Sequence, residues 1–180
     1  MIPTLKTQRL ILRGANASDK EGFISFLTSK RAQFAGGTDD KAKAADEFTD
    51  RTNPWSSREL GLFILTQKSD GRAIGHVGGF LPEGWPEIEL GWSLWQDTDE
   101  GKGFAAESAT AVLRYAFDVL GWSTGVSYIA PDNKRSITMA KRLGARLDEA
   151  AKRPEGLNCL VYRHIAAETA DDDGSVEAYA

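Results

Sequence analysis

The chain has 180 residues, of which 41% are hydrophobic and 27% charged, and this size and composition predict one globular domain. No run approaches the roughly 18 apolar residues of a membrane-spanning helix, and the first residues lack the basic-then-apolar order of a secretory signal. The single cysteine, Cys159, excludes an intrachain disulfide and favours a reducing, cytoplasmic setting.

The net charge of −4 comes from the end of the chain. Residues 166–180 hold five of the 26 acidic residues and no Lys or Arg, so the rest of the chain is close to neutral. We therefore expect a folded domain over residues 1–165 and a solvated, disordered tail over 166–180. The basic excess that is typical of nucleic-acid-binding proteins is missing.

The first elements in chain order are a strand and two helices. Alternating apolar residues predict a strand over residues 5–13. Asn16 supplies N-cap chemistry for a helix over 18–31, and a second, more polar helix is expected over 39–51. Three strands joined by turns rich in Gly, Pro and Asp should follow, over residues 62–67, 73–81 and 87–95.

The second half of the chain predicts alternating helices and strands. These are a helix over 105–120, a strand over 126–129, a helix over 134–143 and strands over 145–149 and 158–165. The complete order is βααβββαβαββ. It predicts an α+β (mixed α/β) fold with a central, mixed, mostly antiparallel sheet of about seven strands flanked by about four helices.

The most informative segment is the loop over residues 99–108, between a predicted strand and a predicted helix. Its Gly-x-Gly turn would place backbone N–H groups at the positive end of a helix dipole, which suits a diphosphate. The predicted anion site consists of Gly101, Lys102, Gly103, Phe104, Ala105 and Ala106. Lys102 either adds charge to the phosphates or is a solvated lysine. Because several antiparallel strands precede this loop, a Rossmann nucleotide-binding fold is disfavoured.

Four segments together resemble the GNAT superfamily of acyl-CoA-dependent N-acetyltransferases. They are residues 7–13, 89–95, 101–107, and 133–136 followed by Leu143 and Gly144. Their order is most similar to the RimJ/RimL branch, the ribosomal-protein N-terminal acetyltransferases and their small-amine relatives. The resemblance covers residues 5–165 and implies acetyl-CoA as co-substrate, no metal, and a monomer or homodimer. The acceptor would be a peptide N-terminus or a small-molecule amine, with no nucleic acid or membrane involved.

The resemblance also implies roles for individual residues. The backbone of Trp92, Ser93 and Leu94 would splay from the next strand and pair with the pantetheine arm of coenzyme A, with an N–H near Ser93 or Leu94 polarising the thioester carbonyl. Asn133 would bond the same arm, although it equally suits an N-cap. Ser136 would lie near the thioester sulfur and donate a hydrogen bond to the departing thiolate.

Glu89 is the predicted general base. A carboxylate is uncommon in an apolar strand unless it faces a cleft, and burial would raise its pKa toward working pH. Glu87 lies on the same face by the two-residue period and is its nearest competitor. The other titratable residues, His76, His164 and Cys159, suit a core or edge position better than a metal site or a nucleophile.

The chain departs from the family pattern at two positions. Thr98 stands where the loop usually has Gln or Arg, and Ala140 falls where many members carry a Tyr that protonates the thiolate. The general acid is therefore unassigned, and a non-catalytic acyl-CoA-binding or sensor module is the alternative function. Residues 30–60 and 82–87 are expected to line the acceptor side, where the mixture of Arg, Asp, Glu and Trp selects no substrate.

Overall fold

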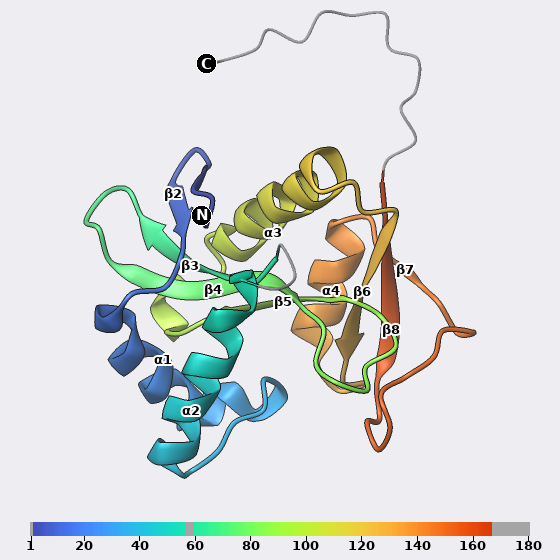
Figure 1. The fold of residues 1–180 in the computed structure, drawn as a ribbon, viewed down its shortest axis with the longest axis horizontal. Coiled ribbons are helices and arrows are strands. Elements are labelled where there is room, and N and C mark those ends of the chain that lie inside the picture. Colours follow the sequence, from blue (N-terminus) through green and yellow to red (C-terminus); the bar gives the residue numbers. More distant parts are fainter. Residues whose placement is uncertain (1, 57–59, 167–180) are drawn as a thin grey trace, which may run out of the picture.

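A computed structural model describes residues 2–56 and 60–166, which form one eight-stranded sheet with four α-helices (Figure 1). The strand order is β1-β2-β3-β4-β5-β6-β8-β7, and every neighbouring pair is antiparallel except β5 and β6. The strands are β1 Leu5–Lys6, β2 Leu10–Arg13, β3 Leu62–Gln67, β4 Ala73–Phe80, β5 Glu89–Leu94, β6 Thr124–Ile129, β7 Arg146–Leu147 and β8 Leu160–Ile165. The predicted tail lies, from residue 167 on, outside the described residues.

The mixed, mostly antiparallel sheet is confirmed, but the described residues form eight strands rather than about seven. The additional strand arises because the segment over 5–13 is interrupted. The Thr7 N–H donates to the Leu10 carbonyl (3.0 Å), which turns the chain so that β1 pairs back onto β2, with Leu5 opposite Leu12.

The helices are α1 Lys20–Leu27, α2 Lys41–Thr52, α3 Phe104–Arg114 and α4 Lys134–Arg142. The first is shorter than predicted because the Ser29 hydroxyl caps the Phe26 carbonyl (2.7 Å), after which residues Lys30–Phe34 form a 3₁₀ turn. The helix predicted over 105–120 begins one residue earlier and widens into a π-helical turn at Tyr115–Val119. No helix in the described ranges is long and apolar enough to cross a membrane.

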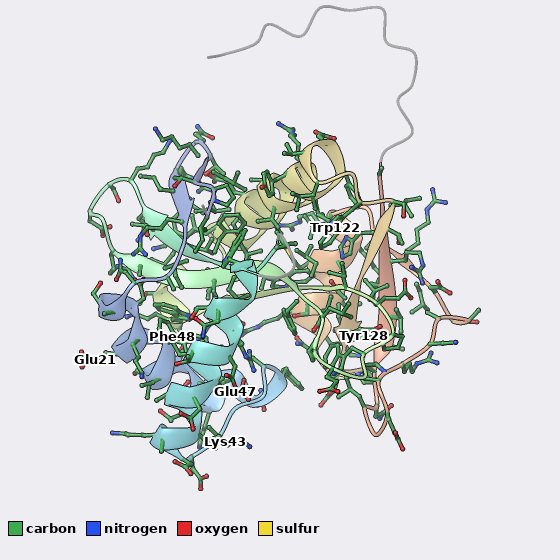
Figure 2. The ribbon with its side chains drawn as sticks, in the orientation of Figure 1. Glu21, Lys43, Glu47, Phe48, Trp122 and Tyr128 are labelled. Atoms are coloured by element: carbon green, nitrogen blue, oxygen red, sulfur yellow. The ribbon has the colours of Figure 1, made fainter. Side chains whose placement is uncertain are left out.

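Helices cover both faces of the sheet. On one face α1 and α2 bury Phe23 and Phe48, whose rings meet edge-on at 5.4 Å; Phe48 points inward from α2, whereas Lys43 of the same helix is exposed (Figure 2). On the other face α3 packs mainly on β4 and β5. The alternation of a strand explains the two layers, because Phe63 of β3 contacts the α3 side and Ile64 the α1–α2 side.

The sheet opens between β5 and β6. These parallel strands share one register pair, Glu89 with Val126, and the Val126 N–H donates to the Ile88 carbonyl (3.0 Å). One residue further, the Ser127 hydroxyl rather than a backbone amide donates to the Leu90 carbonyl (2.7 Å). Beyond that point the two strands no longer pair, and no strand of the described chain pairs with the facing edge of β5.

The glycine loop before α3 is anchored by charged contacts to the rest of the sheet. Fully buried Asp99 accepts two hydrogen bonds from Arg72 (2.9 and 2.7 Å). At the other end of the loop, Glu107 accepts from the Arg9 guanidinium (2.7 Å), and Arg9 also donates to the Lys102 carbonyl (2.8 Å). Paired charge-assisted hydrogen bonds of this kind fix the position of a loop.

Candidate active site

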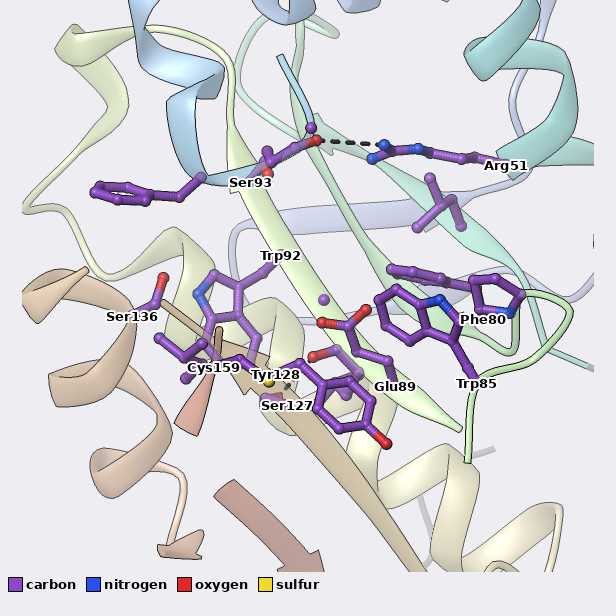
Figure 3. Close-up of a pocket in the computed structure, with 18 of the residues that line it drawn as sticks. Arg51, Phe80, Trp85, Glu89, Trp92, Ser93, Ser127, Tyr128, Ser136 and Cys159 are labelled. Atoms are coloured by element: carbon purple, nitrogen blue, oxygen red, sulfur yellow. Dashed lines mark hydrogen bonds between the residues drawn. The ribbon is translucent and has the colours of Figure 1, made fainter. Parts of the chain in front are cut away.

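A cavity of about 1020 Å³ opens where β5 and β6 part (Figure 3). Its walls come from β5, β6, α2, the loop between β4 and β5, the first turn of α4 and the loop that precedes β8. The candidate residues Glu89, Trp92, Ser93, Asn133 and Ser136 all line it. Widely separated parts of the sequence therefore meet at one place.

Glu89 lies at the join of β5 and β6 and directs its carboxylate into the cavity (Figure 3). Its side chain is buried, and this burial raises the pKa of Glu89 from 4.5 to about 8, against smaller opposing effects of a Tyr128 backbone hydrogen bond and the Arg51 charge. Glu89 is thus mostly protonated at neutral pH, and its carboxylate is a competent base just above it.

Glu87 has a different environment from Glu89. It lies before β5 begins, outside the described lining of the cavity, and its carboxylate takes two hydrogen bonds from Arg163 (2.6 and 2.8 Å). These hydrogen bonds from Arg163 lower the pKa of Glu87. The two-residue period that suggested a shared face fails here because the strand starts only at Glu89, so Glu87 is an ion-pair partner.

The backbone of β5 presents alternate residues to the gap. The Trp95 N–H donates to the Ile74 carbonyl of β4 (2.9 Å), so in an antiparallel ladder the Ser93 amide also faces β4. The amides of Trp92 and Leu94 consequently face the opposite side, toward the gap. The Leu94 carbonyl there accepts a hydrogen bond from Arg31 (3.0 Å).

The glycine loop presents an uncapped helix N-terminus. Gly101 and Gly103 have φ of +72° and +82°, and Gly103 is the N-cap of α3 with no side chain bonded to the first turn. The first intrahelical bond runs from the Glu107 N–H to the Gly103 carbonyl (3.0 Å), which leaves the amides of Phe104, Ala105 and Ala106 without helical partners. This arrangement fits a diphosphate.

Asn133 and Ser136 lie one turn apart at the start of α4. The Asn133 side-chain oxygen accepts from the Ser136 N–H (3.2 Å), so Asn133 is an N-cap and a cavity residue at once. Ala140, one turn further, is fully buried against Ile129 and Tyr162. The position at which the resemblance predicts a Tyr therefore carries a buried methyl group and no hydroxyl.

An acidic residue links three parts of the site that sequence reasoning did not connect. Glu100, just before the glycine loop, accepts hydrogen bonds from Arg31 (2.7 Å) and from Arg135 at the start of α4 (2.8 and 2.7 Å). Arg31 also pairs with Asp97. Nothing in the sequence pattern indicated these partners, because they are separated by 69 and 35 positions.

The two histidines are buried and neutral. Trp95 donates to Nδ1 of His76 (3.0 Å), and burial, assisted by the Arg51 charge, lowers the pKa of His76 to about 3. His164 contacts the Ser127 hydroxyl (3.0 Å), and burial lowers its pKa to about 4. Cys159 lines the cavity, and burial raises the pKa of its thiol, which keeps it protonated. Within residues 2–56 and 60–166, no group of three or more metal-ligating side chains is present.

Residues 9–146 match the family model described as "Acetyltransferase (GNAT) domain". The chain belongs to the GNAT acetyltransferase family. The crystal structure of an acetyltransferase from Agrobacterium tumefaciens str. C58 has a TM-score of 0.87 at 36% identity, covering 92% of this chain and 96% of that one. YnaD of Bacillus subtilis (strain 168), an uncharacterized N-acetyltransferase, is 23% identical over 158 residues, 84% of this chain and 89% of YnaD.

A more distant solved structure, of the microcin C7 self-immunity acetyltransferase MccE, holds acetyl-CoA and AMP; its TM-score is 0.68 at 14% identity over 88% of this chain and 93% of that one. At this identity the likeness shows the fold alone. The family match, together with the two relatives above, makes this GNAT protein an N-acetyltransferase enzyme, and GNAT enzymes take their acetyl group from acetyl-CoA.

The buried carboxyl of Glu89 predicts a pH-dependent stability. Glu89 ionises near 4.5 in the unfolded chain but near 8 in the fold, so its contribution to the free energy of unfolding falls as pH rises from about 4.5 to about 8. Glu89→Gln removes this loss. Relative to the wild type, its free energy of unfolding should therefore increase over the same pH range, by an amount on the order of a few kcal/mol. Urea unfolding at pH 5, 6.5 and 8 measures it.

Glu87→Gln is the matched control, and its effect on stability should have the opposite sign. The pKa of Glu87 is lowered in the fold, so the ion pair of Glu87 with Arg163 stabilises the fold at pH values above the ordinary pKa of Glu, and this stabilisation is lost in acid. Glu87→Gln should be less stable than the wild type at pH 8. Parallel pH–stability curves for Glu89→Gln and the wild type would contradict the burial of an ionisable carboxyl.

Proposed function

We propose that this GNAT acetyltransferase transfers the acetyl group of acetyl-CoA to a primary amine, with Glu89 as the general base. The observation that carries the proposal is the buried carboxyl of Glu89, aimed into the cavity at the point where β5 and β6 part. A base with a pKa of about 8 is matched to accept a proton from an attacking amine near neutral pH.

Two sets of backbone amides fit coenzyme A. The amides of Phe104, Ala105 and Ala106, which lie outside the described lining of the cavity, suit the diphosphate. The gap-facing amides of Trp92 and Leu94 suit the amides of the pantetheine arm as an added strand. Asn133 lines the same cavity, and its N-cap bond uses only the side-chain oxygen. When bound, acetyl-CoA supplies the activated acetyl group as a thioester.

Groups of the protein then accept the proton of the amine and stabilise the carbonyl oxygen of the thioester. As the amine nitrogen bonds to the carbonyl carbon and the carbon–sulfur bond breaks, the nitrogen loses a proton to Glu89, directly or through one water. An N–H of Trp92 or Leu94 stabilises the charge that develops on the carbonyl oxygen. Ser93 is the weaker candidate for this role because its amide faces β4.

The acceptor amine belongs to one of two classes in this proposal. The resemblance to the ribosomal-protein acetyltransferases of the RimJ/RimL branch favours a peptide N-terminus as the acceptor. The resemblance to the small-amine relatives of that branch favours a small-molecule amine. A screen of both classes for acetyl-CoA-dependent thiol release tests the function. Binding of acetyl-CoA without turnover of any amine would favour the non-catalytic sensor instead.

Glu89→Gln should lower kcat/KM about 10²–10⁴-fold, because the amide cannot accept the proton. For the wild type, kcat/KM should rise with pH and level off above about 8, following the pKa of Glu89. Steady-state thiol release between pH 6 and 9.5 measures both. Glu87→Gln, whose carboxylate is held by Arg163, should retain the rate. An unchanged rate in Glu89→Gln would remove Glu89 as the base.

Ser136 is the proposed hydrogen-bond donor to the departing thiolate, since it lines the cavity one turn after Asn133. Ser136→Ala should lower kcat about 10-fold with little change in KM for acetyl-CoA, because the bond strengthens only as the sulfur gains charge. Thr138→Ala, an exposed hydroxyl on the same helix, is the control. Wild-type kcat in Ser136→Ala would exclude the role.

Gly101 tests the diphosphate loop against a matched glycine. Gly101 and Gly121 have φ of +72° and +68°, and in both an added Cβ meets no atom within 4 Å. Either Ala substitution should therefore cost about 1 kcal/mol of stability from backbone strain. Only Gly101→Ala should also raise KM for acetyl-CoA, by about tenfold or more, because its Cβ would intrude on the phosphates. Equal KM values in the two variants would argue against the loop as the diphosphate site.

A further inference from the structure

Three aromatic rings form a corner beside Glu89. Phe80 ends β4 and lies directly opposite Glu89 in the β4–β5 register, Trp85 comes from the following loop, and Tyr128 comes from β6. Trp85 bridges the other two rings, with centroids 6.0 Å from Phe80 and 5.1 Å from Tyr128. All three line the cavity around the Glu89 carboxylate (Figure 3). We call these three residues the aromatic corner.

Four further apolar residues line the same cavity. Leu81 and Pro82 come from the β4–β5 loop, and Leu157 and Phe34 come from the loop before β8 and from the turn after α1. Leu157 and Phe34 are 42% and 43% exposed, among the few large apolar side chains that the described chain leaves open to solvent. Exposed apolar side chains in the lining of a pocket favour an apolar ligand.

The opposite wall is polar, and α2 contributes Arg51, Glu47 and Asp50 to it. Arg51 of α2 donates from Nε to Glu47 (2.8 Å) and from Nη2 to the Ala35 carbonyl (3.3 Å). Glu47 is therefore engaged by Arg51 and is a weak partner for a second ammonium group.

We propose that the acceptor is a primary amine attached to an aromatic or branched aliphatic body, which lies on the aromatic corner while its nitrogen sits over Glu89. This inference rests on the proposed function and deepens it by naming the substrate class. Two sources share this chemistry: small arylalkyl amines, and peptides whose first side chain is large and apolar. Polyamines and amino sugars lack the apolar body and are disfavoured.

The test is thiol release from acetyl-CoA by the full chain with matched amines. 2-Phenylethylamine is compared with ethanolamine and spermidine, and a Phe-Gly-Gly peptide with a Ser-Gly-Gly peptide. The aromatic member of each set should have a kcat/KM at least about tenfold higher, because a hydrophobic pocket discriminates by this factor or more per buried group. A preference confined to the free amines, or to the peptides, assigns the source.

Substitutions at Leu157 and in the aromatic corner should weaken the preference for aromatic amines. Leu157→Ser and Trp85→Ala should each reduce the ratio of phenylethylamine to ethanolamine kcat/KM at least about threefold. Leu157→Ser keeps the test decisive if Trp85→Ala fails to fold, since Leu157 is exposed. Val119→Ser is the control, because Val119 is 67% exposed and lies outside the described cavity lining.

The outcomes distinguish a failure of the inferred substrate class from a failure of the proposed acetyl transfer to amines. Equal rates for all amines, or a preference for spermidine, would overturn the inference while leaving the proposed function in place. No turnover of any amine by a protein that binds acetyl-CoA would overturn the proposed function. In that case, melting-temperature shifts with phenylethylamine and ethanolamine still test the corner, and equal shifts would overturn it.

Discussion

The site depends on the separation of β5 and β6 after a single parallel register pair. In a continuous sheet the amides of Trp92 and Leu94 would be paired and covered by the next strand. Because the strands part, these amides face the gap, and Trp92 and the side chains around the join line the cavity. The side chain of Ser127 takes over the pairing at Leu90, which ends the ladder without an unsatisfied carbonyl.

The same opening explains the electrostatics of Glu89. Glu89 is the residue of β5 that pairs in register with β6, and its buried carboxyl lies among the sheet, Trp85 and Tyr128. Desolvation raises its pKa, whereas Glu87, two residues earlier, meets Arg163 and has its pKa lowered. Two carboxyl groups with the same sequence context thus acquire opposite properties, and only one is suited to proton transfer at neutral pH.

Charged contacts hold the glycine loop beside this opening. Asp99 and Glu107 fix its two ends through Arg72 and Arg9, and Glu100 ties it to α4 through Arg135. The loop backbone is thereby placed without a side chain capping α3, so the first amides of the helix keep their hydrogen-bonding capacity. An anion site needs this combination of a rigid position and unused donors.

The sequence by itself determined the element order from α1 onward, the mixed sheet, the glycine loop and Glu89 as an unusual carboxylate in an apolar strand. These rest on local periodicity and on residue chemistry, which act over a few positions. Only the tertiary structure decided that Glu87 is an ion-pair partner, that Ser93 faces β4, and that Phe80, Trp85 and Tyr128 meet beside Glu89. Such contacts join residues far apart in the chain, and they follow from strand register and from where β5 and β6 part, which no local pattern encodes.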